Sequence, residues 1–474
     1  MPWMTRLTWV VVCAGLILTG SAGCVGQRPA TSQVAAPSVA VSTASDPAPA
    51  TGASSPPGPS EAGEVPELTL ERLIQIALEN QPRIRNAEAV RRGAEARVGT
   101  ARAGYFPTIN TTLGYNRATA NIGGGISPAT GTPIPRRVSG TSVNNQNFTA
   151  GFSQNIFDSF RREWRVQVAR EDLNAAGFDL STTRQDVILN VHQTYYNHLL
   201  AVRLVEVSQE AVERNIQNLN RAKGFFEVGT RPKIDVTRAQ VDLANAELDR
   251  VRARNRVATT LTALNNAIGV PDHPPYRLKK ELEITPTPAT LEESIRMGLE
   301  SRTELRALQA RIRSAEASLT LARRNFLPSL SGDANWNYRG QELPFAPNWL
   351  AGVTLTVPVL NPPLFSQHNE AAATLAAAQA SAEITQQNII LEVQQNYLAL
   401  EEARERIRTS EVLVLQAREN LELAEGRYQV GVGPLIDVTD AQLALTRAES
   451  ENIQALIDFK LAEFQLRKAS GLLE

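Results

Sequence analysis

FEVGTRPKIDVTRAQ, at Phe226–Gln240, is repeated as YQVGVGPLIDVTDAQ at Tyr428–Gln442. Both copies read V-G-x-x-P-x-I-D-V-T-x-A-Q. The glycine stands where a helix would end in a left-handed cap, and the proline can begin the next helix, because a first-turn N–H has no helical partner to lose. The pattern therefore predicts two tight helical hairpins. Their tips are expected at about residues 228–235 and 430–437, with Val228, Gly229, Pro232 and Asp235 in the first and Val430, Gly431 and Pro434 in the second.

The hairpins belong to a duplication that spans most of the chain. TLERLIQIALENQPRIR, starting at Thr69, resembles TLEESIRMGLESRTELR, starting at Thr290, and ARAGYFPTI at Ala101 resembles ARRNFLPSL at Ala322 with the same separation. Each copy is expected to run helix, strand, strand, long helix, turn and helix. The expected boundaries are residues 67–270 for the first repeat, 271–289 for a linker and 290–474 for the second repeat.

Four segments alternate between apolar and polar side chains, as strands with two different faces do. They are expected at about residues 106–117, 147–158, 328–339 and 348–360. The stretch between the first two, Ala118–Asn147, is rich in glycine, proline and threonine and is predicted to be a long loop. A soluble sandwich would alternate in the same way. A membrane barrel is favoured by the small, amide-rich polar face and by aromatic side chains near the strand ends, as in interfacial girdles. These aromatic residues are Tyr115, Phe148, Trp336, Tyr338 and Trp349.

Four strands are too few to close a barrel. An open sheet edge in lipid leaves backbone N–H and C=O groups without hydrogen-bond partners. If the strands span a membrane, other copies of the chain must therefore complete the barrel.

Long helices account for most of the remaining mass. Residues 161–228 contain no proline and only two glycines, and one helix over this range would be about 100 Å long. Apolar residues recur every three or four positions from Ile188 to Val205, and the second repeat shows the same spacing from Ile390 to Leu400. Such a narrow stripe is typical of coiled coils. The expected fold class is therefore mainly α with a small β part.

The N-terminus has the features of a secretion signal. An apolar run at Leu7–Leu18, too short to span a bilayer, is followed by small residues and Cys24. This order resembles the lipobox of bacterial lipoproteins, in which residues 1–23 are removed and Cys24 carries lipid such as palmitate. An ordinary secretory signal is the alternative, because Ser21 stands where the lipobox prefers leucine. No aspartate follows the cysteine, which favours the outer membrane. Residues 24–66, rich in Pro, Ala and Ser, would form a flexible tether.

The paired hairpin segments, set in this duplicated plan, resemble the TolC-type outer-membrane factor family and in particular its lipoprotein members. The resemblance runs from about Leu68 to Leu473. It implies a homotrimer whose twelve strands form a β-barrel in the outer membrane of a Gram-negative bacterium, continued in the periplasm by a long α-helical barrel. It also implies that the hairpin tips dock a periplasmic adaptor (a membrane fusion protein) and, through it, an inner-membrane pump.

The same resemblance implies that Asp437 and Asp440 of the second hairpin ring a closable periplasmic aperture. Their spacing places both carboxylates on one helix face, and three copies would bring six to a constriction that could filter charge. They could instead be favourable acids at a helix N-terminus. The first hairpin has Arg238 at the second of these positions. Gly433 stands where some relatives have an arginine, and Arg231 holds that place in the first hairpin, so the closing contact is expected to be built differently.

The sequence shows no enzyme site. The four histidines form no metal-binding pair, both cysteines lie in the N-terminal segment, and no phosphate-binding loop is present. We therefore predict no catalytic residue, cofactor or metal, and a net charge of −1 gives no basis for nucleic-acid binding. The predicted function is a passive outer-membrane exit duct of a tripartite efflux or export system, opened by docking to the adaptor and pump. A type I protein-secretion duct and a periplasmic coiled-coil adaptor are the alternatives, although adaptors carry one such hairpin.

Overall fold

The computed structural model describes residues 67–122, 125–126, 133–134, 137–271, 276–278, 290–340 and 346–473. The signal and tether expected at residues 1–66, with Cys24, lie outside this range, as does most of the linker expected at 271–289. No helix among the described residues combines the length and the apolar character needed to cross a membrane.

Each repeat contains four helices in the expected order. The first repeat has α1 (Leu70–Asn80), α2 (Pro82–Ala103), α3 (Arg161–Glu227) and α4 (Lys233–Ala267). The second has α5 (Leu291–Ser301), α6 (Thr303–Arg324), α7 (Pro362–Gln429) and α8 (Leu435–Ala469). The 67 residues of α3 make a helix of about 100 Å. The prediction of one uninterrupted long helix is therefore confirmed, and α7 repeats it with 68 residues.

The two repeats also begin with the same capping contact. The Thr69 hydroxyl accepts a hydrogen bond from the backbone N–H three residues later at 3.4 Å, and Thr290 does the same at 3.3 Å. Each threonine thus satisfies one of the first-turn N–H groups of α1 or α5. The duplication detected in the sequence is therefore a duplication of local structure.

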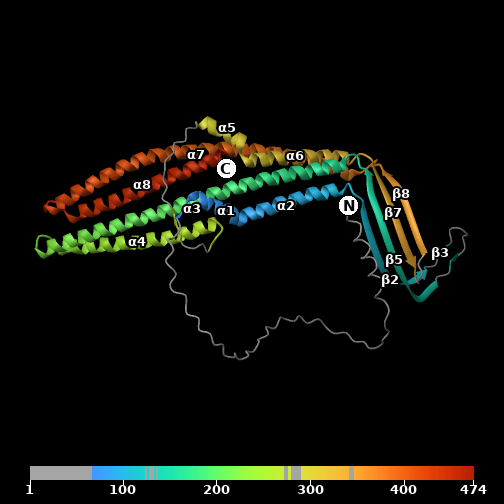
Figure 1. Cartoon of the computed structure of the whole chain (residues 1–474), viewed down its shortest axis with the longest axis horizontal. Coiled ribbons are helices and arrows are strands. Elements are labelled where there is room, and N and C mark those ends of the chain that lie inside the picture. Colours follow the sequence, from blue (N-terminus) through green and yellow to red (C-terminus); the bar gives the residue numbers. More distant parts are fainter. Residues whose placement is uncertain are drawn as a thin grey trace, which may run out of the picture. The chain divides into compact units, whose positions relative to one another are not determined.

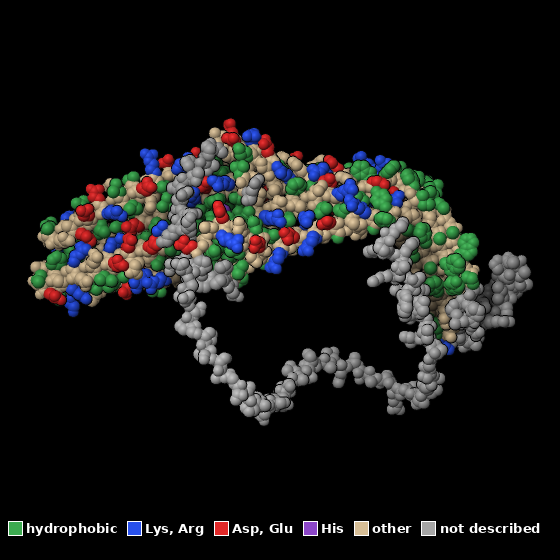
Figure 2. Space-filling model, in the orientation of Figure 1, with side chains coloured by type: hydrophobic (Ala, Val, Ile, Leu, Met, Phe, Trp, Pro, Cys, Tyr) green, Lys and Arg blue, Asp and Glu red, His purple; other side chains and the backbone are tan. Residues whose placement is uncertain are grey.

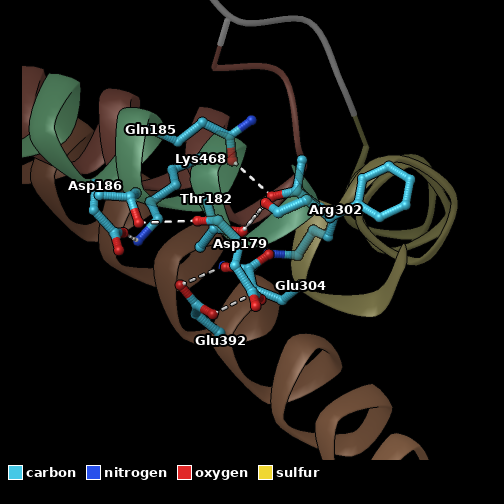
Figure 3. Close-up of polar contacts among 11 residues, drawn as sticks. Asp179, Thr182, Gln185, Asp186, Arg302, Glu304, Glu392 and Lys468 are labelled. Carbon is cyan, nitrogen blue, oxygen red and sulfur yellow. Dashed lines mark hydrogen bonds and ion pairs between the residues drawn. The ribbon is translucent and has the colours of Figure 1, made fainter. Parts of the chain in front are cut away.

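A single extended residue separates each short helix from the next, and the two repeats fix it differently. In the first repeat, Gln81 Nε2 donates a hydrogen bond to Ala267 O, at the C-terminus of α4, at 2.8 Å. In the second, Arg302 is 5% exposed and donates from two guanidinium nitrogens to Glu392 of α7, with Glu304 also within ion-pair distance (Figure 3). This buried arginine joins α5 and α6 to α7.

The strands form one four-stranded antiparallel sheet in the order β2-β5-β7-β8. They are β2 (Thr108–Ile122), β5 (Arg137–Phe157), β7 (Ser329–Gly340) and β8 (Ala346–Thr356). Two smaller pairs join β1 (Glu67–Leu68) to β6 (Arg277–Leu278) and β3 (Gly125–Ile126) to β4 (Pro133–Ile134). The first of these pairs attaches the start of the first repeat to the segment that links the repeats.

The observed strands differ from the expected ones at their ends. The loop expected at Ala118–Asn147 contributes to both β2 and β5, and the register pairs Asn121 with Val138. Its polar Asn, Ser and Thr side chains conceal a ladder that is built from backbone groups. At the other end of the sheet, β8 stops at Thr356 instead of about residue 360, and Pro358, which has no N–H for a ladder bond, follows shortly.

Large apolar side chains remain exposed on the sheet. Ile109 and Leu113 of β2 are 73% and 76% exposed, and Trp349 and Val353 of β8 are also exposed. Figure 2 shows hydrophobic side chains gathered over the sheet and the adjoining helix ends, whereas acidic and basic side chains are mixed along the helices. Within the described residues β2 and β8 are edge strands. The sheet therefore presents both an apolar surface and two open edges.

The long helices pack as two hairpins, α3 with α4 and α7 with α8, which lie side by side along α3 and α8 (Figure 1). Three apolar clusters line these contacts. One surrounds Tyr195 and Leu199 of α3, one lies near the hairpin tips around Tyr428 and Val438, and one joins α5 and α6 to α7 and α8 around Val393. The fold class expected from the sequence, mainly α with a small sheet and a duplicated plan, is confirmed.

Candidate functional site: the hairpin tips

The two hairpin tips have the same backbone. Gly229 and Gly431 have φ values of +77° and +82°, in the left-handed region that glycine adopts without strain. In both tips the residue after the glycine donates its N–H to a carbonyl of the preceding helix at 3.0 Å, which closes the helix end. Pro232 and Pro434 are the N-caps of α4 and α8 and not their first residues. The prediction of two matching hairpins is confirmed, with this shift of one position.

Apolar side chains protrude from these tips. Val228 is 70% exposed and Val430 is 75% exposed, and Val432 and Ile234 are exposed as well. One step further along α8, Val438 is fully buried. The tips thus combine a packed interior with an apolar outer surface.

Arg231 connects the two tips. Its Nη2 donates a hydrogen bond to Gly433 O at 2.7 Å, and its guanidinium lies 5.0 Å from the centre of the Tyr428 ring. Tyr428 is buried and packs edge-on against Phe225 of the first hairpin, with 5.5 Å between ring centres. Burial raises the pKa of Tyr428, and Asp235 raises it further, whereas Arg231 lowers it. The tyrosine therefore stays neutral beneath the arginine, as a cation–π contact requires.

Two further arginines of α3 reach the second hairpin. Arg221 pairs with Glu425 of α7 at 3.1 Å, and Arg214 pairs with Glu449 of α8 at 3.0 Å. Both pairs are partly shielded from solvent, so salt screens them less than exposed pairs. Together with Arg231 they form a series of contacts from the first hairpin to the second. We call these three contacts the arginine series.

The predicted aperture aspartates both lie near the start of α8. Asp437 is in its first turn, 3.8 Å from Arg427 Nη1, and Asp440 is exposed on the following turn. Asp235, the counterpart of Asp437 in the first hairpin, is buried. The two repeats are therefore not equivalent here. A ring around an axis needs further copies of the chain and stays a prediction.

Sequence reasoning missed most of the arginine series. It noted that Arg231 and Gly433 exchange places between the repeats, but it did not bring the two together. Arg214 and Arg221 are seven residues apart, a spacing that places them on one face of a coiled coil, and this spacing could have drawn attention to them. Their partners depend on how α3 packs against α7 and α8, which no local pattern shows.

Known proteins share this architecture. The chain is 26% identical to "Outer membrane protein TolC" of Vibrio cholerae over 84% of its length and 89% of that protein, and 24% identical to "Probable efflux pump outer membrane protein TtgC" of Pseudomonas putida over 85% and 82%. Among solved structures it matches the CmeC outer membrane channel of Campylobacter jejuni (TM-score 0.70, 19% identity, 85% and 86% coverage) and the outer membrane protein VceC of Vibrio cholerae (TM-score 0.69, 20% identity, 85% and 96% coverage). At these identities the solved structures establish a shared fold.

The family comparison covers both repeats. The description "Outer membrane efflux protein" belongs to the family whose model matches residues 73–270 and 295–472. These two ranges contain both hairpin tips and all four strands of the main sheet. With its duplicated hairpins, its four-stranded sheet and this match over most of its length, the chain belongs to the outer membrane efflux protein family.

Proposed function

We propose that this chain is the outer-membrane exit duct of a tripartite efflux or export system and that it is a passive channel without catalytic activity. The observation that carries the proposal is the sheet, which has two open edges and exposed apolar side chains and continues directly into the long helical hairpins. A chain built in this way can join a lipid-embedded barrel to a periplasmic tunnel. Its relatives are named as outer membrane proteins of efflux pumps, which supports the same role here.

A homotrimer would satisfy both the sheet and the helices. Three copies would supply twelve strands, with β8 of one copy next to β2 of another, and no edge would remain open in the lipid. On α7, exposed apolar residues recur at seven-residue intervals, a coiled-coil spacing that needs a partner helix. They are Ile384, Leu391, Leu398 and Val412. The exposed residues Val241 and Leu248 show the same interval on α4. Neighbouring copies would cover these stripes.

The hairpin tips are the surface we assign to the periplasmic adaptor. Exposed valines at Val228 and Val430 give the tips an apolar surface, and such surfaces mark sites of protein association. The adaptor would connect the duct to an inner-membrane pump that supplies the energy. A protein-secretion duct would use the same fold, and the adaptor and pump genes beside this one would distinguish the two. An adaptor role for this chain itself is disfavoured by its two hairpins, its sheet and its family.

Lipid at Cys24 would provide a second anchor besides the barrel. We expect Cys24→Ala to abolish acylation, measured as the mass of the N-terminal peptide, and to leave trimers that still float with outer-membrane vesicles. The barrel alone buries enough apolar surface to hold the protein in the membrane. If the variant were released completely into the soluble periplasm, the protein would have no barrel.

The periplasmic aperture would be formed by Asp437 and Asp440 from three copies. Six close carboxylates would attract multivalent cations, so a trivalent cation added from the periplasmic side should block the ion current. Replacing both residues with Ala should raise the half-blocking concentration by about tenfold or more, since Coulomb attraction grows with the number of opposing charges. The measurement is single-channel current of the purified protein in a planar bilayer.

Asp235→Ala is the matched control for the aperture. Asp235 is buried in the first hairpin, and Arg238 offsets its charge on the same helix, so the block should change little. An unchanged block in the double variant would rule out the aspartate ring and leave the duct itself standing.

A further inference from the structure

A cavity of about 300 Å³ lies between the two hairpins, close behind their tips. Its walls come from α3, α4 and α8, labelled in Figure 1. The helices α4 and α8 belong to different hairpins, so anything bound here would touch both. We call this cavity the inter-hairpin groove.

Gln442 of α8 lines the groove and is only 4% exposed. Neither its Oε1 nor its Nε2 has a hydrogen-bond partner within the described residues. A buried amide without partners is costly, and nearly all buried polar groups in proteins are paired. The side chain therefore indicates an occupant of the groove that offers it a polar contact.

Two carboxylates face the groove from opposite hairpins, Asp242 on α4 and Asp440 on α8. Burial raises the pKa of Asp242; the charge of Arg238 opposes this rise and the charge of Asp440 adds to it. Neither aspartate has an ion-pair partner among the described residues. Two negative charges thus share one partly enclosed space, which favours a positive occupant.

The other charged groups that line the groove are already paired. Arg214 contacts Glu449 at 3.0 Å and Glu210 at 3.6 Å. Asp249 contacts Arg252 at 3.0 Å. The charges of Asp242 and Asp440 are therefore the ones left to balance.

The groove offers oxygen donors of the kind that hard divalent cations prefer. Besides the two carboxylates, Gln442 contributes an amide oxygen, and Thr439 and Thr446 contribute hydroxyl groups. A water molecule occupies about 30 Å³ of liquid, so the volume holds an ion together with several of its waters. No cysteine or histidine lines the groove, so softer metals have no preferred ligand in it.

We propose that the inter-hairpin groove binds one divalent cation of the calcium or magnesium type per chain, held by Asp242 and Asp440 with the Gln442 amide oxygen as a neutral ligand. The ion would bridge α4 to α8 and hold the two hairpins of one chain together, in addition to the arginine series. The site lies within a single chain and does not depend on the aperture ring proposed above.

The test is equilibrium dialysis of radioactive calcium against the full-length purified protein, first stripped with a chelator, with magnesium as competitor. We expect saturable binding of one ion per chain in the range of about 0.1 to 1 mM that is typical of weak extracellular sites. Asp242→Asn should weaken binding by about tenfold or more, because it removes one of two charged ligands. Asp249→Asn is the control on the same helix, and it should bind as the wild type does.

Two further variants distinguish this site from the aperture and from a folding defect. Asp437→Asn should keep one ion per chain, since Asp437 does not line the groove. Gln442→Glu adds a third carboxylate and should bind calcium more tightly, a gain that misfolding cannot produce. The proposal is overturned if the wild type binds no calcium, so that water alone fills the groove, or if binding survives Asp242→Asn and is lost in Asp437→Asn, which would place the ion at the aperture.

Discussion

Replacing Arg231 with Ala is expected to open the periplasmic end of the channel. The variant loses the 2.7 Å hydrogen bond to Gly433 O and the stacking on Tyr428, the contacts that join the two hairpins at their outermost point. A hydrogen bond from a charged donor and a cation–π contact together contribute about 2 kcal/mol at a partly exposed site. That corresponds to roughly a thirtyfold shift in each chain between joined and separated tips. Single-channel conductance in planar bilayers should rise several-fold.

Arg252→Ala is the matched control, because this arginine of α4 is exposed and pairs only with Asp249 of its own helix among the described residues. It should leave the conductance unchanged. Arg231→Lys should give an intermediate result, since lysine keeps the charge but not the planar fork of donors. Equal conductance of Arg231→Ala and the wild type would show that this contact does not hold the channel closed.

The second large effect is expected at Glu392, far from the tips. Glu392 neutralises the buried guanidinium of Arg302 at the junction of α5 and α6 (Figure 3). In Glu392→Gln this arginine stays buried with only Glu304 opposite it at 3.4 Å. Removing one partner of a buried pair leaves an uncompensated charge, which typically costs about 3 kcal/mol or more. Urea unfolding of the purified protein, followed by circular dichroism, should show this loss.

Glu300→Gln gives the matched control for Glu392. Glu300 pairs with Arg296 at 3.2 Å on the surface of α5, and both side chains are exposed. Exposed pairs four residues apart on a helix contribute less than about 0.5 kcal/mol. If the two variants had equal stability, the Arg302 contact would be no more than a surface pair.

The sequence was sufficient for the features that local patterns encode. Three- and four-residue periodicity predicted α3 as one helix, and the Gly and Pro positions predicted both turns. The outer parts of β2 and β5 were missed, because polar strands that pair through backbone groups resemble a loop in sequence. The pairing of β1 with β6 was missed too, since two residues in each strand carry no pattern.

The contacts between hairpins were beyond sequence reasoning for a different reason. Arg231 and Gly433 are 202 residues apart, and Asp242 and Asp440 are similarly distant. Whether such residues meet depends on the packing of α3 against α8. The role of Asp437 and Asp440 at an aperture depends on an even longer-range fact, the arrangement of several chains, and therefore stays a prediction.

The central claim is that three copies of this chain close a single duct through the outer membrane. Electron cryomicroscopy of the full-length protein in lipid nanodiscs tests it most directly. We predict three chains around one axis, with β8 of each paired to β2 of its neighbour inside the lipid and Asp437 and Asp440 nearest the axis at the far end. A single chain, or a sheet that lies outside the lipid with β2 and β8 unpaired, would contradict the account.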